Sequence, residues 1–587
     1  MKRIRRLGSY TMTLGLIILL SAPLGFAQAG ARQRFVQRDQ SDQSAMQNPS
    51  ETENQSAQQE DQQEALFGPV HPLMVQRVGI DPNQILRLSL HDAILMALEN
   101  NNDIQVERTN VQIADYNLKS FRGAYDFFVE PFIQYRSDTR PAPSRLQQGV
   151  GGIPLSSTET LDYNISVSEQ LPWWGTTWRF SINNTRTLTN NAFAAVNPFY
   201  NAAIRIDVTQ PLLRNFRIDQ TRSQIRIQKK AINLSDSLFR QRVIDIITQV
   251  QRAYWDLVFA IRAVEIRQEA LELAKTNLEN NRKKVEAGTV APIDLAQSEA
   301  QVEQERQNLI TAIGNVTAME NALKALIIGD PNAPEWRANI VPTESIGHLA
   351  PVIDYESAIR LALANRPELE QLKLRKEQKE IEIKYLKNQT LPQIDLVASY
   401  TSNGLKGSEV ILDPDLVPPG FAGETPAGLI GGPGDALRQA FTNDFRTISF
   451  GLRMNFPIRN QTARANLGRA RAERRSLDFQ ENKLIQLIST EVRNALQNVE
   501  TARQNIEAAR AARIARERQL EGEQKKFEAG LSTTFFVLQF QNFLSQARLA
   551  ELQALVNYNK AIADLQRVMS TTLSAHNVEI APPMGGK

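Results

Sequence analysis

Two long segments of the chain carry apolar residues at alternating steps of three and four. From about Thr221 to Glu286, and from Thr462 to Glu528, the sequence contains almost no Gly or Pro. The apolar positions of the first segment are Val243, Ile247, Val250, Tyr254, Leu257, Ile261 and Val264. Those of the second are Ile485, Ile488, Val492, Ala495, Val499, Ala502, Ile506 and Ala509. This spacing is typical of coiled-coil packing. Each segment predicts a helix on the order of 100 Å long.

Each long segment ends in nearly the same amino-acid sequence. KKVEAGTVAPIDL runs from Lys283 to Leu295, and KKFEAGLSTTFFV runs from Lys525 to Val537. Gly288 and Gly530 follow the helical pattern, and glycine tolerates the left-handed conformation that closes a helix. A returning helix follows each glycine, to about Ile328 and about Leu573. We therefore expect two long helical hairpins, with their tips at residues 288 and 530.

Shorter elements precede each long segment. Ser89 and Asp354 are N-cap residues for short helices, and a second helix follows each, to about residues 123 and 389. Alternating patterns then predict strands over about 128–212 and about 392–457, two in each half. Residues 163–188, around the turn Pro172-Trp173-Trp174-Gly175, predict an additional hairpin whose place the sequence does not give. The order of elements thus occurs twice, as an internal two-fold repeat.

Four further segments are predicted outside the two repeats: two before the first repeat, one between the repeats and one after the second. Basic residues precede the apolar run from Met12 to Leu20, and Ala27-Gln28-Ala29 fits a secretory cleavage site, so residues 1–29 predict a signal peptide. The alternative is a retained N-terminal anchor. Residues 30–85 are rich in Gln and Ser and predict disorder. The repeats span residues 86–330 and 351–575, with a linker over 331–350 and a tail over 576–587.

Composition narrows the classes of protein that fit. The net charge of +3 gives no reason to expect nucleic acid, and the absence of cysteine removes disulfides, thiolate metal sites and cysteine nucleophiles. After the signal peptide, no segment has the roughly 20 apolar residues of a spanning helix. If the mature protein enters a membrane, it must do so as a β-barrel.

The order of these elements resembles the TolC-type outer-membrane efflux channel family. The resemblance covers about Leu88 to Leu573 and depends on three motifs: the duplicated Glu-Ala-Gly tips, the strand-ending Gln210-Pro211-Leu212-Leu213, and the helix with Ala93, Ala97, Leu98 and Asn100. It implies a mixed α+β membrane protein, a homotrimer. Each copy would give four strands to a 12-stranded β-barrel, continued by a long α-helical coiled-coil tunnel.

The resemblance also implies partners and a site at the tips. It predicts a location in the cell outer membrane, among its lipids, with the helical part in the periplasm. A periplasmic adaptor (membrane fusion) protein would dock at Gly288, Thr289, Gly530 and Leu531. An inner-membrane transporter would supply the energy. Asp294 matches an acidic position of the family's gate.

The second tip departs from the family's pattern. Well-studied members have Tyr three residues before the second glycine, Arg two after it, and Asp six and nine after it. This chain has Phe527, Ser532, Phe536 and Gln539 at those positions. The family's ion pairs and acidic ring therefore do not transfer. We predict a more apolar constriction, with Asp294, Phe536 and Gln539 as candidate gate residues.

Three other groups of residues are candidates for a function. Basic residues after the strands could form a basic belt or a solvated helix face: Arg222, Arg226, Lys229, Lys230, Arg464, Arg469, Arg471, Arg474 and Arg475. Trp173, Trp174 and Trp178 could form an interfacial girdle or pack within their hairpin. His71, His91, His348 and His576 lack ligand spacing. We predict no metal and no cofactor.

The sequence offers no catalytic residues and predicts that the chain is not an enzyme. It has no P-loop, GxSxG or HExxH motif. We expect an outer-membrane channel of a tripartite efflux or type I secretion system, acting as a passive exit duct. The alternative is an exported coiled-coil scaffold of the cell envelope without a pore. Cargo, pump and adaptor are not specified by the sequence.

Overall fold

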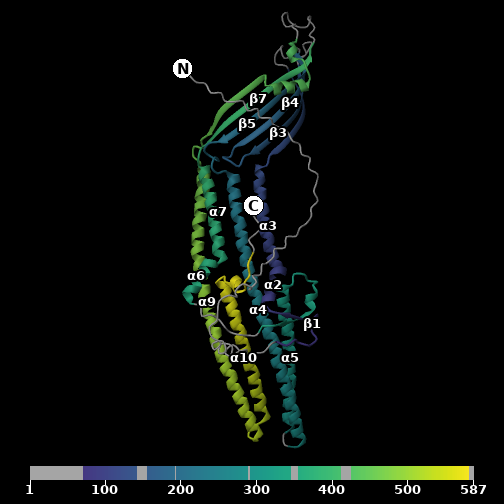
Figure 1. Cartoon of the computed structure of the whole chain (residues 1–587), viewed down its shortest axis with the longest axis vertical. Helices are drawn as coiled ribbons and strands as arrows, with labels where there is room; N and C mark the ends of the chain where they lie inside the picture. The colour runs from purple at the N-terminus through teal and green to yellow at the C-terminus, as the bar shows by residue number, and fades with distance from the viewer. Residues whose placement is uncertain are drawn as a thin grey trace, which may run out of the picture.

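A computed structural model describes residues 70–141, 155–191, 193–288, 291–344, 354–410 and 425–580. The chain is elongated, with a sheet at one end and two helical hairpins at the other (Figure 1). The predicted signal peptide, most of the predicted disordered segment and Thr289 lie outside the described residues. Within the described residues, no helix is both long and apolar enough to cross a bilayer.

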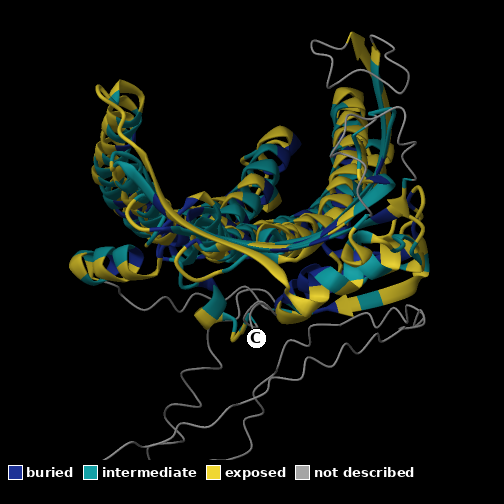
Figure 2. Cartoon of the chain, turned by 90° about the horizontal axis from the view of Figure 1, so that it is seen from above, coloured by how far each residue is buried: buried dark blue, intermediate teal, exposed yellow. Residues whose placement is uncertain are grey.

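The large sheet has six antiparallel strands in the order β2-β3-β4-β5-β7-β8. Their bounds are β2 Phe128–Pro141, β3 Leu155–Gln170, β4 Thr177–Thr189, β5 Val196–Pro211, β7 Gln393–Glu409 and β8 Phe445–Asn455. Seen from above, the sheet is curved rather than flat (Figure 2).

The prediction of four strands per chain was wrong, because the additional hairpin belongs to the same sheet. It forms β3 and β4, which lie between β2 and β5. The count of 12 strands assumed four from each copy, so that assumption fails too. Alternation identifies a strand but not its partner, because pairing depends on residues far away in the chain. This is why the sequence could not place the hairpin.

Four helices join the same end of this sheet. α3 (Asn102–Arg122) leads into β2, α4 (Gln220–Glu286) follows β5, α7 (Pro367–Gln389) leads into β7, and α9 (Gln461–Glu528) follows β8. Farther from the sheet, α5 (Pro292–Ile327) returns along α4, and α10 (Thr534–Val568) returns along α9. The remaining helices are short: α2 Leu90–Asn100, α6 Tyr355–Asn365, α8 Pro433–Thr442 and α11 Thr572–Ala575.

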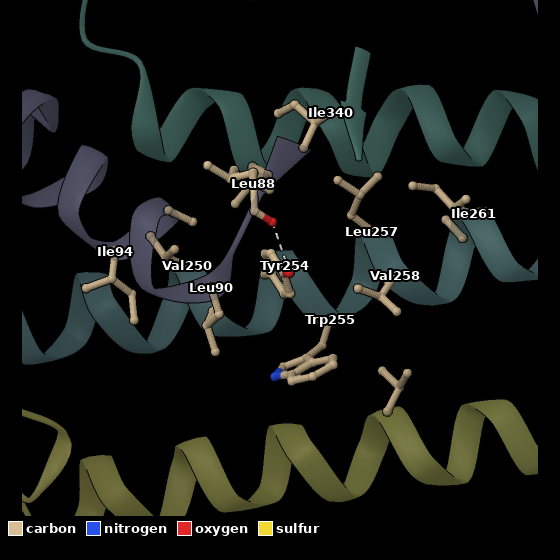
Figure 3. Packing of buried hydrophobic residues seen from close by; sticks show 14 of the residues in the cluster. Leu88, Leu90, Ile94, Val250, Tyr254, Trp255, Leu257, Val258, Ile261 and Ile340 are labelled. Atoms are coloured by element: carbon tan, nitrogen blue, oxygen red, sulfur yellow. Dashed lines mark hydrogen bonds between the residues drawn. The ribbon is translucent and has the colours of Figure 1, made fainter. Parts of the chain in front are cut away.

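The two predicted long helices are confirmed to within a residue at each end. All seven apolar positions of the predicted stripe on α4 are buried. They pack against α2, α5 and α10 rather than against one partner helix (Figure 3). Tyr254 lies in this stripe, and its hydroxyl donates to the Leu88 carbonyl oxygen at 3.1 Å. Burial raises the pKa of Tyr254 to about 12, so the phenol remains a donor.

A second, two-stranded parallel sheet pairs β1 (Asp81–Leu88) with β6 (Ala338–Pro342). Its strands correct two predicted boundaries, since β1 begins within the predicted disordered segment and β6 lies within the predicted linker. Neither strand could be expected to form alone. Both depend on pairing across about 250 residues of sequence, which local composition does not reveal.

A buried cluster of charges fixes this small sheet to α5. Arg77 and Lys324 both pair with Glu320, and all three side chains are almost fully buried. Arg77 also donates to Asn339 at 2.7 Å, and the Lys324 ammonium donates to the carbonyl oxygens of Trp336 and Ala338 at 2.9 and 2.6 Å. Burial lowers the pKa of Lys324, and the Glu320 carboxylate opposes that effect.

A short helix, α8, covers part of the large sheet beside β5 and β7. β7 continues to Glu409, and α8 packs on the sheet through Ala436 and Ala440, which contact Ala202. Gly404 permits this contact, because a Cβ atom there would lie 2.0 Å from the Ala436 carbonyl oxygen.

We expect Glu320→Gln to lower the free energy of unfolding by about 3–5 kcal/mol, because two buried cations would lose the carboxylate with which both pair. Denaturant unfolding of the purified protein measures this. The matched control is Glu303→Gln, since Glu303 pairs with Arg306 on the exposed side of the same helix. That change should cost less than about 1 kcal/mol. Equal effects would contradict the role assigned to the buried cluster.

Candidate functional site

The large sheet has one apolar and one polar face. Residues that lie directly opposite one another on paired strands share a face, and neighbours along a strand alternate. One row across all six strands is apolar: Val129, Val167, Phe180, Ile206, Tyr400 and Ile448. The next row, on the opposite face, is polar: Glu130, Ser166, Ser181, Arg205, Thr401 and Thr447.

Much of the apolar face is exposed in the single chain. Ile133 and Phe450 are each 77% exposed, and Ile206, Leu396, Leu452 and Met454 are also exposed. α8 covers the part of this face formed by Ala202 and Ile204. Soluble proteins rarely expose a contiguous apolar surface that spans six strands. Alternation of an apolar face and a polar face is the pattern of strands that separate lipid from water.

A second exposed apolar band lies where the sheet meets the helices. It is formed by residues at strand ends and turns, namely Phe127, Phe128, Trp173, Trp174, Leu212, Leu213, Leu391, Phe456 and Ile458. Trp174 also stacks on Phe216, with ring centroids 6.3 Å apart. Trp178 differs, because its indole N–H donates to Glu169 within the hairpin at 3.0 Å. Trp178 therefore fits the interpretation of packing within the hairpin, whereas the exposed Trp173 and Trp174 fit that of an interfacial girdle.

Both hairpin tips turn at a glycine in the left-handed conformation. Gly288 has φ of +71°, and its N–H donates to the Val285 carbonyl at 2.9 Å. Gly530 has φ of +75°, and the Leu531 N–H donates back to the Lys526 carbonyl at 2.8 Å. A Cβ atom at either glycine would meet no other atom. The backbone conformation, not crowding, therefore requires glycine at these positions.

The candidate gate residues lie on different hairpins. Asp294 is in the first turn of α5, where it is half-buried. Phe536 is 46% exposed at the start of α10, beside the exposed Phe535, and their rings are 5.5 Å apart. Gln539 is half-buried one turn later. Among the described residues, Asp294 has no hydrogen bond or ion pair to the second hairpin, so the single chain does not bring these residues together.

Other contacts join the two hairpins near their tips. The Lys284 ammonium lies 4.1 Å from the centre of the Phe527 ring, and Asn277 donates to Gln541 at 2.7 Å. Phe527 also lines a cavity of about 310 Å³ between α4 and the second hairpin. At the second tip, the Ser532 hydroxyl donates to Glu523 and lowers the pKa of that carboxyl. Phe527 and Ser532, which stand where the resemblance would place Tyr and Arg, thus both make contacts near the tips.

Several of the basic residues after the strands form ion pairs. Arg222 pairs with Asp219 at 2.9 Å, Lys230 pairs with Glu377 at 2.7 Å, and Arg474 pairs with Asp478 and Glu380. These pairs fit the interpretation of a charged helix surface. Within the described part of the chain, no group of three or more His, Asp or Glu residues could hold a metal ion.

The sequence missed the apolar residues of β3 and β4 as parts of the continuous face. Their signal was present, since Ile165 and Val167 alternate with Asn164 and Ser166, and Phe180 and Ile182 alternate with Arg179 and Ser181. The alternation of apolar and polar residues did not indicate which strands pair with β3 and β4.

A curved two-faced sheet joined to long helical hairpins defines the class of outer-membrane channel subunits. Three solved structures have this fold. They are a membrane protein from Pseudomonas aeruginosa (18% identity, TM-score 0.59, 85% of this chain and 95% of that one), the CmeC outer membrane channel of Campylobacter jejuni (17%, 0.58, 84% and 90%), and the open-state MtrE outer membrane channel of Neisseria gonorrhoeae (17%, 0.53, 82% and 88%).

The sequence itself matches a known family. The profile described as "Outer membrane efflux protein" matches residues 188–328 and 358–571, which is more than half of the chain. No curated protein matches the sequence. The chain therefore belongs to the outer membrane efflux protein family, as the resemblance of its motifs predicted. It is an outer-membrane efflux channel protein, and the alternative of a scaffold without a pore is not supported.

We expect Gly288→Ala to lower the free energy of unfolding by about 1–2 kcal/mol, because alanine is strained at positive φ. Chemical denaturation measures the change. Gly314→Ala is the matched control, since Gly314 lies inside α5 with no atom near its Cβ position. That change should raise stability by up to about 1 kcal/mol. The same sign for both substitutions would contradict this account of the tip.

Proposed function

We propose that the chain works as a homotrimer that forms a closed passage through the outer membrane and continues into the periplasm. The apolar face of the sheet would contact lipid, and the polar face would line the passage. The observation that carries this proposal is the pair of adjacent rows, one apolar and one polar, that cross all six strands.

The unpaired edges of the sheet support the assembly of several copies of the chain. Among the residues that the structure describes, β2 and β8 each pair with one neighbouring strand, so each has an edge of unpaired backbone N–H and C=O groups. Such groups cost several kcal/mol each in hydrocarbon. Pairing β8 of one copy with β2 of the next would remove every open edge.

The helical hairpins supply the periplasmic part of the proposed duct. Their tips, at Gly288 and Gly530, lie at the end opposite the sheet. Leu531, which is 81% exposed, offers an apolar contact for the adaptor. The chain would form a passive duct, with energy supplied by an inner-membrane transporter. The cargo would be a small molecule, a metal ion or a secreted polypeptide, according to that partner.

The oligomer and its conductance can be tested together. We expect protein extracted from membranes in detergent to migrate as a trimer until it is boiled, and to conduct ions in planar bilayers. A closed β-structure that joins three copies accounts for the heat sensitivity. Recovery as a soluble, non-conducting rod from the periplasm would contradict the proposed function.

We also propose an apolar gate at the second hairpin. Phe536 occupies the first of two positions that are acidic in well-studied family members, and Gln539 occupies the other. Three copies would bring three Phe536 rings around one axis, without the carboxylates that hold divalent cations. Asp294 on the first hairpin would be the remaining acidic group of the gate.

Divalent block of single channels tests this gate. We expect weak block of the wild-type channel by cations added at the periplasmic side, and block at about tenfold lower concentration in Phe536→Asp, because three carboxylates would then surround the axis. Phe535→Asp is the matched control, since its side chain leaves the same helix in another direction. Strong block of the wild-type channel would refute the apolar gate.

A further inference from the structure

We propose that the β3–β4 hairpin enlarges the outer-membrane pore to a ring of 18 strands. Selection of cargo by size would then depend on the helical tips alone. This inference rests on the proposed homotrimer and adds to it the dimensions of the pore. Three copies with six strands each supply 18 strands, in place of the 12 that four-stranded copies would give.

β3 and β4 are integral strands of the large sheet, which would form the wall of the pore, and not a hairpin that lies on its surface. Their backbones pair with β2 and β5 along most of their lengths. They also continue both faces without a break, with Val167 and Phe180 in the apolar row and Ser166 and Ser181 in the polar row. A hairpin outside the wall would not need two faces that match its neighbours.

The six-stranded sheet and the helical layer next to it have similar widths. Strands about 4.8 Å apart and tilted by about 40° each occupy about 6.3 Å of circumference, so six cover about 38 Å and four cover about 25 Å. Next to the sheet, α3, α4, α7 and α9 pack side by side in that order. Four helices about 9–10 Å apart also cover about 38 Å. Six strands therefore match the helical layer, whereas four would narrow the passage.

The number of strands also sets the diameter of the proposed pore. Barrel diameter grows roughly in proportion to strand number, so 18 strands give about 1.5 times the diameter of 12. The face of β3 and β4 that would line this pore is hydrophilic, with Asn164, Ser166, Ser181 and Asn183 beside an ion pair between Arg179 and Glu130 at 2.9 Å. These residues add a wide, hydrated surface and no plug. The sheet would then let pass any cargo that the tips admit.

Disulfide cross-linking tests the wall directly, because the chain has no native cysteine. Gln134, Asp162, Thr185 and Asn201 form one row over β2, β3, β4 and β5. We expect Q134C/D162C and T185C/N201C to form disulfides within one copy of the assembled, conducting channel. The control pair Q134C/N201C spans three strand spacings, roughly 15 Å, and should not link. In a four-stranded wall, β2 would lie beside β5 and only the control pair would link.

Pore sizing tests the bore. Neutral polymers of graded size, added at the outer side, lower single-channel conductance when they enter the pore. We expect the largest polymer that enters the wild-type pore to have about 1.5 times the radius of the largest that enters a variant lacking residues 147–190, which joins β2 to β5 directly. Equal limits would overturn the enlarged pore.

The two proposals fail in different ways. A conducting trimer in which only Q134C/N201C links would overturn the 18-stranded ring and leave the proposed function intact. A protein that neither trimerises nor conducts would overturn the proposed function itself. If the shortened variant does not assemble, the cross-links in the full-length chain decide the question.

Discussion

Open backbone edges are the constraint on which the rest of this structure depends. In the single chain, β2 and β8 each leave a row of N–H and C=O groups unpaired, at the two ends of a sheet whose apolar face is exposed. Water can satisfy such groups, but hydrocarbon cannot. A single copy therefore cannot place this sheet stably in a bilayer. Under the proposed function, closure with other copies would be a condition for insertion.

The long helices also depend on neighbouring elements, because each must bury its apolar stripe against them. The apolar stripe of α4, from Val243 to Val264, lies in one continuous buried cluster. Residues of several other elements complete that cluster, so the stripe does not depend on a single partner helix. α4 also contacts α3 and α7 near the sheet, and α5 and α10 beyond it. α4 and α9 each run from the sheet to a tip, and α4 also contacts helices of both hairpins.

The sequence predicted the features that depend on local pattern. The ends of α4 and α9, the buried stripe from Val243 to Val264 and the turning glycines all follow from spacing and backbone preference within a few residues. The features that it missed depend on distant partners. Nothing near Ile165 or Phe180 indicates that β3 and β4 lie between β2 and β5. Nothing near Arg77 indicates that it pairs with Glu320, which lies 243 residues away.

The residues of the candidate site likewise fall into those with a local role and those whose role depends on distant partners. Gly288 and Gly530 could be found from sequence, because their role is local and conformational. The two-faced wall could be found only in part, because each strand showed its alternation but not its place in the row. The relation between Asp294 and Phe536 cannot be read from a single chain at all, since it requires the assembled axis.

The two tips show how one geometry can carry two chemistries. Both glycines have nearly the same positive φ, and a Cβ atom at either would meet no other atom. The residues six positions later differ in chemistry, since one is Asp294 and the other is Phe536. The surface that a partner would meet is set by the backbone, whereas the group that would meet the cargo is set by those later side chains. If the tips dock a partner and these later residues gate the passage, as proposed, then docking and gating could change independently.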